Sequence, residues 1–356
     1  MGSITAAADA VIETIDLSAY LSSDDPIVRK ATADRLVQAL HKQGGCGLVG
    51  HGLTLKAIHE ALTRSKEFFD LPLDQKQTIN HPEGILPHRG YSGVSREKIR
   101  VYTEDELQSM SGELGATAKK AMDWKEHYDI GSDYEPEHHN RWIDKALLPG
   151  FQPFMSDFIT QLEQLHTNVL NAILLGLEVD PISADYFRGL HTHHNSGIRL
   201  LHYPSMRESE IDRTSTTWCP IHTDFTTFTF LIQDENQGLE IEDRTNKTPN
   251  TFVAANPSIP DRLWLTIGDF GEIWTNGYLP ASRHRVVIPA PLPGSGTDMT
   301  SNRYSIPYFL NPRHDGILEP LGTGKPATMP RDRYKKMKVR DHIEFRMKYQ
   351  YTDPTK

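Results

Sequence analysis

Three side chains in this sequence have the types and the spacing of a metal site. His222 and Asp224 are separated by one residue, at the start of the run 225–232, which is almost entirely β-branched or aromatic. Such a composition favours a β-strand, and alternate residues of a strand point to the same face. The run therefore predicts that this imidazole and this carboxylate can bind one ion together. His284 begins another β-like run, 284–288, and supplies a second imidazole.

Two histidines and one carboxylate on one side of an ion form the facial arrangement that suits non-haem Fe(II), because open positions are left for substrate and oxygen. The same three ligands also satisfy Zn(II). A pair of the form H-x-D arises often by chance in a chain with 17 histidines. The residues alone leave three hypotheses open: an iron oxygenase, a zinc hydrolase, and a binding protein without catalytic function.

A second pair of residues has the chemistry of an anion site. Arg303 and Ser305 follow His284 by one predicted hairpin and share a strand face. A guanidinium group is planar, permanently charged and able to bind a carboxylate through two hydrogen bonds, and the hydroxyl adds a third donor. Next to a metal site, this pair predicts an anchor for a dicarboxylic cosubstrate.

The first half of the chain predicts helices, short strands and one long irregular stretch. Apolar residues recur at helical spacing in three segments, and the longest of these is expected to pack against a sheet. The irregular stretch is long enough to serve as a lid over a pocket. The predicted elements are helices over 26–43, 55–69 and 151–176, strands over 12–17 and 47–49, and strand-like residues 124–130 within the irregular stretch 80–140.

The second half of the chain predicts many short strands with Gly and Pro between them, which is typical of an antiparallel barrel or jelly roll. Asn276-Gly277 predicts a hairpin, and residues 331–351 predict a return to helix. The predicted strands cover 198–203, 225–232, 239–242, 251–254, 263–267, 272–275, 284–288 and 304–310.

The predicted fold class is α+β, with a double-stranded β-helix (jelly roll) core flanked by helices and an N-terminal helical or mixed region. We expect four segments along the chain. They are an N-terminal mixed α/β region over 1–140, the long helix and a linker over 141–195, the jelly-roll domain over 196–315, and a C-terminal helical segment over 316–356.

Composition narrows the classes of partner. A net charge of -9 does not indicate the basic surface that binds nucleic acid. The local basic cluster at 331–338 predicts a solvent-exposed helix face. Two cysteines are too few for a disulfide framework, and no apolar run has the length of a membrane span. The expected partner is a small-molecule substrate and not nucleic acid or membrane, and the expected compartment is the cytoplasm. The sequence sets no oligomeric state.

Several motifs, taken in order, resemble those of the 2-oxoglutarate/Fe(II)-dependent dioxygenases of the isopenicillin N synthase-like family. The resemblance extends over about residues 12 to 348. The motifs are Gly50-His51-Gly52, Asp123-Trp124-Lys125-Glu126, Arg199 to Pro204, His222-x-Asp224, Gly268-Asp269, Thr275-Asn276-Gly277, His284-Arg285-Val286 and Arg303-x-Ser305.

The resemblance implies a role for each matching residue. His222, Asp224 and His284 would hold the iron, and the pair at 303 and 305 would bind the distal carboxylate of 2-oxoglutarate. Tyr203 would help to hold this cosubstrate. Leu201 stands where some members have Asn, so one cosubstrate contact is expected to be absent.

The resemblance also implies the reaction. Fe(II), 2-oxoglutarate and O2, with ascorbate as an added reductant, would oxidise a small organic substrate of specialised metabolism by hydroxylation, desaturation, cyclisation or ring rearrangement, releasing succinate and CO2. The alternative is a non-haem iron oxidase of the same fold that does not use 2-oxoglutarate. We expect a largely apolar substrate. Candidate substrate contacts are Phe225, Leu201, Ile288, Phe309 and Tyr91. Tyr91 is also a lid candidate, together with Met347 and Tyr351.

Overall fold

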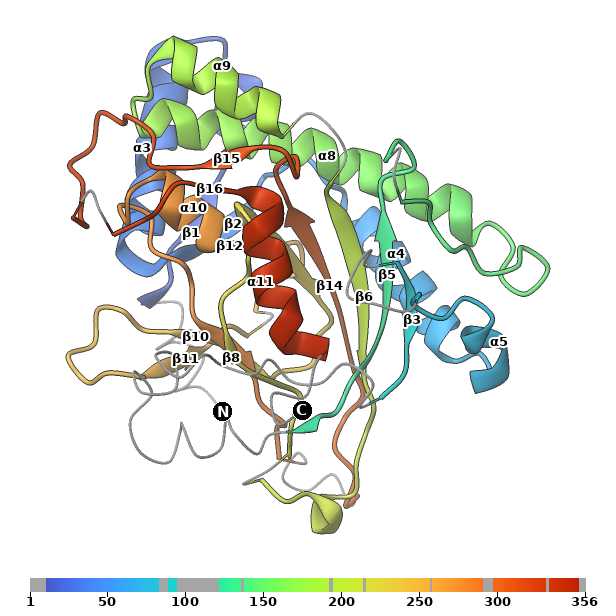
Figure 1. Ribbon diagram of the computed structural model, residues 1–356. Helices are drawn as coiled ribbons and strands as arrows, with labels where there is room; N and C mark the ends of the chain where they lie inside the picture. The colour runs from blue at the N-terminus through green and yellow to red at the C-terminus, as the bar shows by residue number, and fades with distance from the viewer. Residues whose placement is uncertain are drawn as a thin grey trace.

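A computed structural model describes residues 11–82, 89–94, 122–135, 138–191, 195–213, 216–256, 258–290, 297–330 and 333–351. Two β-sheets form its centre, and helices cover one of them (Figure 1). Among the described residues, no helix is both long and apolar enough to cross a membrane.

The larger sheet has eight strands in the order β1-β2-β12-β9-β14-β6-β5-β3. Strands of the N-terminal region flank the jelly-roll strands at both edges of this sheet, so the N-terminal region and the jelly roll share one hydrogen-bonded sheet. In that spatial order, the strands are Thr14–Asp16, Gly45–Val49, Leu263–Ile267, Phe228–Gln233, Arg303–Leu310, Gly197–Tyr203, Glu126–Gly131 and Gly90–Ser92.

The smaller sheet has four strands in the order β11-β10-β13-β8. They are Phe252–Ala254, Leu239–Glu242, His284–Val286 and Cys219–His222. Two further pairs of short strands lie outside these sheets: β4 (Met122–Asp123) with β7 (Thr216–Thr217), and β15 (Ile317–Leu318) with β16 (Met337–Lys338). One turn of 3-10 helix covers Glu208–Glu210.

The alternation of side chains along each strand separates two hydrophobic cores. Leu200 of β6 and Phe230 of β9 belong to the core that packs against the helices. Leu201 of β6 and Val286 of β13 belong to a second core whose members come from both sheets. This second core therefore fills the space between the sheets, which is the interior of the jelly roll.

The three predicted helices of the first half are confirmed. α3 begins at Pro26, where the Asp25 carboxylate accepts a hydrogen bond from the N–H of Ile27 at 2.8 Å, and it ends at Gly44 with φ of 73°. α8 packs closely on α3, since a Cβ at Gly176 would lie 2.4 Å from the carbonyl oxygen of Ala33. The described helices are α2 (Ser18–Ser22), α3 (Pro26–Gln43), α4 (Leu55–Phe69), α5 (Leu73–Gln77), α8 (Phe151–Gly176), α9 (Pro181–Leu190), α10 (Asp269–Trp274) and α11 (Val339–Tyr351).

Two predictions of local structure are wrong. The segment 272–275 is not a strand, because residues 272–274 lie in helix α10 and Thr275 caps its C-terminal end. Asn276 and Gly277 do adopt positive φ values of 51° and 78°, as a tight turn requires, but they end that helix and do not connect two strands. The N–H of Gly277 donates to the carbonyl of Glu272 at 2.9 Å, a bond that closes the helix end.

Two boundaries differ from the prediction by three residues or more. The strand expected over 225–232 begins only at Phe228, because residues 223–227 form bends and a loop. The C-terminal helix begins at Val339 and not at 331, and Met337 and Lys338 before it form β16. Arg331 and Asp332 of the basic cluster, and most of the irregular stretch 80–140, lie outside the described residues.

Candidate active site

The structure brings His222, Asp224 and His284 together. One ligand atom from each lies within 4.8 Å of the others, and among the described residues no other group of three or more His, Cys, Asp or Glu does so. Oδ1 of Asp224 is 3.6 Å from Nε2 of His222 and 3.9 Å from Nε2 of His284. These three atoms can be bonded by one ion after small side-chain movements.

The pairing of two strands of the smaller sheet explains the proximity of the two histidines. β13 runs antiparallel to β8, with His284 directly opposite His222. Directly opposed residues have Cβ atoms about 5 Å apart, and the two rings here lie 4.2 Å apart between centroids. Asp224 reaches them from the loop after β8, so a strand face does not set its position as the sequence predicted.

Hydrogen bonds orient each of the three side chains. Nδ1 of His222 lies 2.8 Å from the carbonyl oxygen of Pro220, and Nδ1 of His284 lies 3.1 Å from that of Ser282. A carbonyl can only accept, so each Nδ1 carries the hydrogen and each Nε2 keeps its lone pair for a metal. Thr229 donates to Oδ2 of Asp224 at 2.7 Å, which leaves Oδ1 turned toward the histidines.

The loop that carries Asp224 is held against the start of α10. The N–H of Asp269 donates to the carbonyl oxygen of Asp224 at 2.7 Å. A Cβ at Gly268 would lie 2.4 Å from the carbonyl oxygen of Thr226 and 2.7 Å from that of Asp224. Only glycine therefore allows this approach, which gives the Gly268-Asp269 motif a physical reason.

Electrostatics also favours a metal at this position. Burial and the neighbouring His222 lower the pKa of His284 to about 4. Its imidazole is therefore neutral at physiological pH, and a neutral imidazole is the form that binds a metal ion. The donor set of two imidazoles and one carboxylate fits Fe(II) with positions left open.

Arg303 and Ser305 lie on one face of β14 inside the jelly roll. Nη1 of Arg303 donates to Oγ of Ser305 at 3.0 Å, and Nη2 donates to Oε1 of Gln233 at 2.9 Å. The guanidinium group lies 5.0 Å from the centre of the Tyr203 ring, which is opposite Arg303 in the β6–β14 ladder. The predicted cosubstrate residues thus form one cluster.

The charge of Arg303 has no close counter-ion within the described protein. Its side chain is fully buried, its Nε has no hydrogen-bond partner, and no described carboxylate lies within 4.0 Å of it. The nearby Asp234 acts on it only through space, since the Asp234 oxygens accept hydrogen bonds from the N–H groups of Tyr304 and Asn236. A buried unpaired charge is costly. A carboxylate ligand at this position would relieve that cost, so the residues present fit 2-oxoglutarate.

The candidate substrate contacts lie in different parts of the structure. Leu201 lies opposite Ser305, and Phe309 lies opposite Thr229, whose hydroxyl binds Asp224. Ile288 is buried in the interior core. Phe225 is half-buried and packs partly on the helix-side core.

Tyr91, the lid candidate whose side chain is described, is not brought to the site. Tyr91 is buried on β3, at the edge of the larger sheet, and its hydroxyl donates to Glu126 at 2.6 Å. This hydrogen bond holds the Tyr91 side chain on the helix-covered face of the sheet. Met347 and Tyr351 lie in α11, but their side chains are outside the described residues.

Two groups of functional interest were missed from the sequence. Gln233 and Thr229 lie in a run that is otherwise apolar, and only the strand register shows that they face the predicted ligands. Arg199 shares the interior face of β6 with Leu201, and it binds Asp129 with distances of 2.7 and 3.0 Å. Its alternation with buried residues was a signal that could have found it.

A jelly roll that gathers two imidazoles and a carboxylate beside a buried arginine defines the class of non-haem iron oxygenases. Family models agree with this class. The family described as "non-haem dioxygenase in morphine synthesis N-terminal" matches residues 12–147, and the "2OG-Fe(II) oxygenase superfamily" matches residues 194–312.

Curated relatives are similar over most of their length. The 2-oxoglutarate-dependent dioxygenase frbA of Dothideomycetidae sp. is 35% identical, with 84% of this chain and 86% of that protein covered. The 2-oxoglutarate-dependent dioxygenase ecdK of Aspergillus rugulosus is 33% identical, with 84% and 87% covered. The proline hydroxylase buaE of Petromyces alliaceus is also 33% identical, with 87% and 90% covered.

Solved structures share the fold. A full-length protein of Neurospora crassa, solved in complex with alpha-KG, has a TM-score of 0.78 and 30% identity, with 94% of this chain and 95% of that chain covered. A putative 2OG-Fe(II) oxygenase family protein from Caulobacter crescentus has a TM-score of 0.72 and 27% identity, with 95% and 98% covered.

The chain belongs to the 2-oxoglutarate/Fe(II)-dependent dioxygenases of the isopenicillin N synthase-like family. It is an oxidoreductase with the α+β jelly-roll fold that the sequence predicted, and its cofactors and cosubstrates are Fe(II), 2-oxoglutarate and O2.

Proposed function

We propose that His222, Asp224 and His284 hold the catalytic Fe(II), and that Arg303 with Ser305 binds the distal carboxylate of 2-oxoglutarate. The observation that carries the proposal is the convergence of the three ligand atoms within 4.8 Å. The buried Arg303, which has no close counter-ion among the residues that the structure describes, supports the second part. Tyr203 limits the space around the guanidinium group and so helps to orient the cosubstrate.

Iron, when bound, would activate O2 as the oxidant: two of the four electrons that O2 takes up would come from the oxidative decarboxylation of 2-oxoglutarate to succinate and CO2, and two from the substrate C–H bond. The residues of the chain position these groups. Thr229 holds one oxygen of Asp224 so that the other faces the histidines, and Gln233 holds the Arg303 guanidinium in its plane. The interior core of the jelly roll keeps water away from the anion site, which strengthens its electrostatic interactions.

The substrate is proposed to be a small molecule of specialised metabolism with at least one polar group. The relatives named as 2-oxoglutarate-dependent dioxygenases come from fungi, and one is named a proline hydroxylase. The interior face of β5 and β6 carries the Asp129–Arg199 ion pair. This charged wall argues against the largely apolar substrate that the sequence suggested. The aromatic ring of Phe309 and the side chain of Leu201 would provide apolar contacts beside it.

The compartment and the segments of the chain are also proposals. Neither Cys46 nor Cys219 forms a disulfide, which supports a reducing compartment such as the cytoplasm. We keep 1–140, 141–195, 196–315 and 316–356 as segments along the sequence. Because strands of the first segment pair with both sides of the third segment's strands in one sheet, the two segments are not proposed to fold independently.

The test measures turnover of 2-oxoglutarate. Anaerobically purified protein loaded with Fe(II) should form succinate in step with consumption of an accepted small molecule, and Zn(II) should block the reaction. Asp224→Ala should lose Fe(II) binding. Arg303→Ala should keep Fe(II) but bind 2-oxoglutarate at least tenfold more weakly, a loss of about 1.4 kcal/mol.

The competing hypotheses predict other outcomes. Substrate consumption without succinate would favour an iron oxidase that does not use 2-oxoglutarate. Activity with Zn(II) alone would favour a hydrolase. Unchanged 2-oxoglutarate affinity in Arg303→Ala would disprove the anchor.

A further inference from the structure

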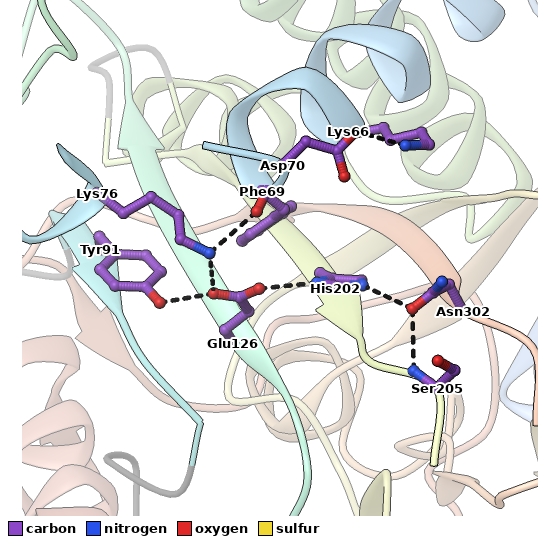
Figure 2. A network of polar contacts seen from close by, with 9 residues as sticks. All are labelled: Lys66, Phe69, Asp70, Lys76, Tyr91, Glu126, His202, Ser205 and Asn302. Carbon is purple, nitrogen blue, oxygen red and sulfur yellow. Dashed lines mark hydrogen bonds and ion pairs between the residues drawn. The ribbon is translucent and has the colours of Figure 1, made fainter. Parts of the chain in front are cut away.

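A buried polar network lies on the helix-covered face of the larger sheet, behind the proposed cosubstrate site. Glu126 of β5 is its centre and is almost completely buried. Its carboxylate accepts hydrogen bonds from Lys76 at 2.8 Å and Tyr91 at 2.6 Å, and it lies 2.7 Å from Nδ1 of His202 (Figure 2). These partners lower the pKa of Glu126 although its burial opposes them, so the carboxylate is charged at neutral pH.

His202 connects this carboxylate to the strand that carries Arg303. In the strand register, Glu126 lies opposite His202, and His202 lies opposite Tyr304. The His202 and Tyr304 rings are stacked, with centroids 4.7 Å apart and an angle of 5° between their planes. On the other side of the ring, Nε2 lies 3.1 Å from Oδ1 of Asn302 (Figure 2).

Both ring nitrogens of His202 face oxygen acceptors. A carboxylate oxygen of Glu126 can only accept when charged, and Oδ1 of Asn302 is fixed as an acceptor because the N–H of Ser205 also donates to it at 2.9 Å. The pattern is therefore complete when both nitrogens carry a hydrogen. His202 is then a two-sided donor that joins β5 to the start of β14.

His202 and its hydrogen-bond partner Asn302 each directly precede a residue of the cosubstrate cluster. Asn302 is followed by Arg303, and His202 is followed by Tyr203. Adjacent residues of a strand point to opposite faces. Fixing Asn302 and His202 on the outer face therefore fixes the backbone from which Arg303 and Tyr203 project into the interior.

We propose that His202 is a positioning residue for 2-oxoglutarate, which sets the spacing of Tyr203 and Arg303 by bridging Glu126 and Asn302. The inference rests on the proposed role of Arg303. Without the bridge, the ends of β6 and β14 keep their ladder but lose the side-chain restraint that defines the guanidinium position. Binding of 2-oxoglutarate is then weakened, while the iron ligands on the smaller sheet are unaffected.

The experiment replaces His202 by Phe in the full chain. The Phe ring retains the stacking on Tyr304 but donates no hydrogen bond. The affinity for 2-oxoglutarate is measured by anaerobic calorimetric titration of Fe(II)-loaded protein. We expect a Kd about tenfold higher, an unchanged Kd for Fe(II), and a raised KM for 2-oxoglutarate with kcat nearly unchanged.

The matched control is His41→Phe. The His41 ring is also stacked, with its centroid 4.1 Å from that of Tyr278. His41 belongs to helix α3 and not to β6 or β14, the strands that carry the cosubstrate cluster. It should leave the affinity for 2-oxoglutarate unchanged. Equal affinity in His202→Phe and the native protein would overturn the inference.

A second pair of variants addresses the same bridge from its exposed end. Asn302→Ala removes the acceptor and should raise the Kd for 2-oxoglutarate about threefold, whereas Asn302→Asp keeps an acceptor oxygen and should restore most of the affinity. Because Asn302 is exposed, Asn302→Ala should fold even if His202→Phe does not. In that case, a 2-oxoglutarate affinity of Asn302→Ala equal to that of the native protein would overturn the inference.

The outcomes separate the two proposals. Loss of affinity in Arg303→Ala without any loss in the His202 and Asn302 variants disproves only the positioning role. No loss in Arg303→Ala disproves the proposed cosubstrate site itself.

Discussion

Arg346 of the last helix forms an ion pair with Asp269, with Nη1 of the arginine 2.8 Å from Oδ2 of the aspartate. The backbone N–H of Asp269 in turn binds the carbonyl of Asp224. Nη2 of Arg346 also donates to the carbonyl oxygen of Thr223 at 3.3 Å. The C-terminal helix α11 is thereby connected to the loop between the first two proposed iron ligands.

Arg346→Ala should weaken Fe(II) binding about three- to tenfold, because the loop that carries Asp224 loses its contacts with Arg346. Arg346→Lys keeps the charge but not the two-pronged geometry, and it should give an intermediate loss. Anaerobic titration with Fe(II) measures the effect. Arg340→Ala, at an exposed position of the same helix, is the control. Equal losses in the two alanine variants would show that α11 does not act through Asp269.

Gly268→Ala should abolish Fe(II) binding or prevent folding, because the added methyl group would overlap the backbone of Asp224 and Thr226. Gly189→Ala is the matched control, since a Cβ there meets no atom within 4 Å. Alanine in the α9 helix should stabilise the fold by about 0.5–1 kcal/mol. Thermal unfolding and Fe(II) titration measure both variants. A Gly268→Ala protein with native iron affinity would contradict the close approach described above.

Thr229→Val should weaken metal binding about 10–100-fold, the usual cost of losing a group that orients a ligand. The substitution preserves the shape of a buried side chain but removes the donor to Oδ2 of Asp224. Thr229→Ser should restore most of the affinity, because its hydroxyl can donate to the same oxygen. If the valine variant binds Fe(II) as the native protein does, Asp224 is oriented without Thr229.

Stability should depend on pH through His191. Burial lowers its pKa from 6.5 to about 4 in the folded protein. Between these values the unfolded chain binds a proton that the folded chain does not, so the free energy of unfolding falls as the pH falls. From pH 6.5 to 5 the loss is about 2 kcal/mol.

Denaturant unfolding of His191→Asn at pH 7 and pH 5 checks this dependence. The variant is less stable at pH 7, because it loses a ring that binds the carbonyl of Phe187 and the hydroxyl of Thr227. Its stability should nevertheless fall less between the two pH values than that of the native protein. His59→Asn, at an exposed position of α4, should retain the native pH dependence.

The elements with strong periodicity were predictable from the sequence. α3, α4 and α8 begin and end at the predicted residues, because Pro26, Gly44, Pro72 and Gly176 mark their ends and the apolar stripes are long. The proposed iron ligands were predictable as residue types, but the reason given for Asp224 was wrong. The position of Asp224 depends on hydrogen bonds to Thr229 and Asp269. No local sequence pattern indicates these two contacts.

Short elements were less predictable, because tertiary contacts decide them. The segment 272–275 has strand-forming residues. It begins in a helix instead, because Gly271 lets helix α10 pack directly against the backbone of Thr227. The Glu126 network joins four elements and depends on strand register, which no local pattern defines. Arg199 was easier to find, since its position between the apolar residues Ile198 and Leu200 was visible in the sequence.

The shared eight-stranded sheet limits how this enzyme can be dissected. A fragment starting at about residue 196 would leave β12 without β2 and β6 without β5, so two strands would expose unpaired N–H and C=O groups along their length. Open edges of this kind recruit other chains. Expression of the iron-binding half alone should therefore give aggregates, and any gene fusion or split-protein design has to keep the first 140 residues with the rest.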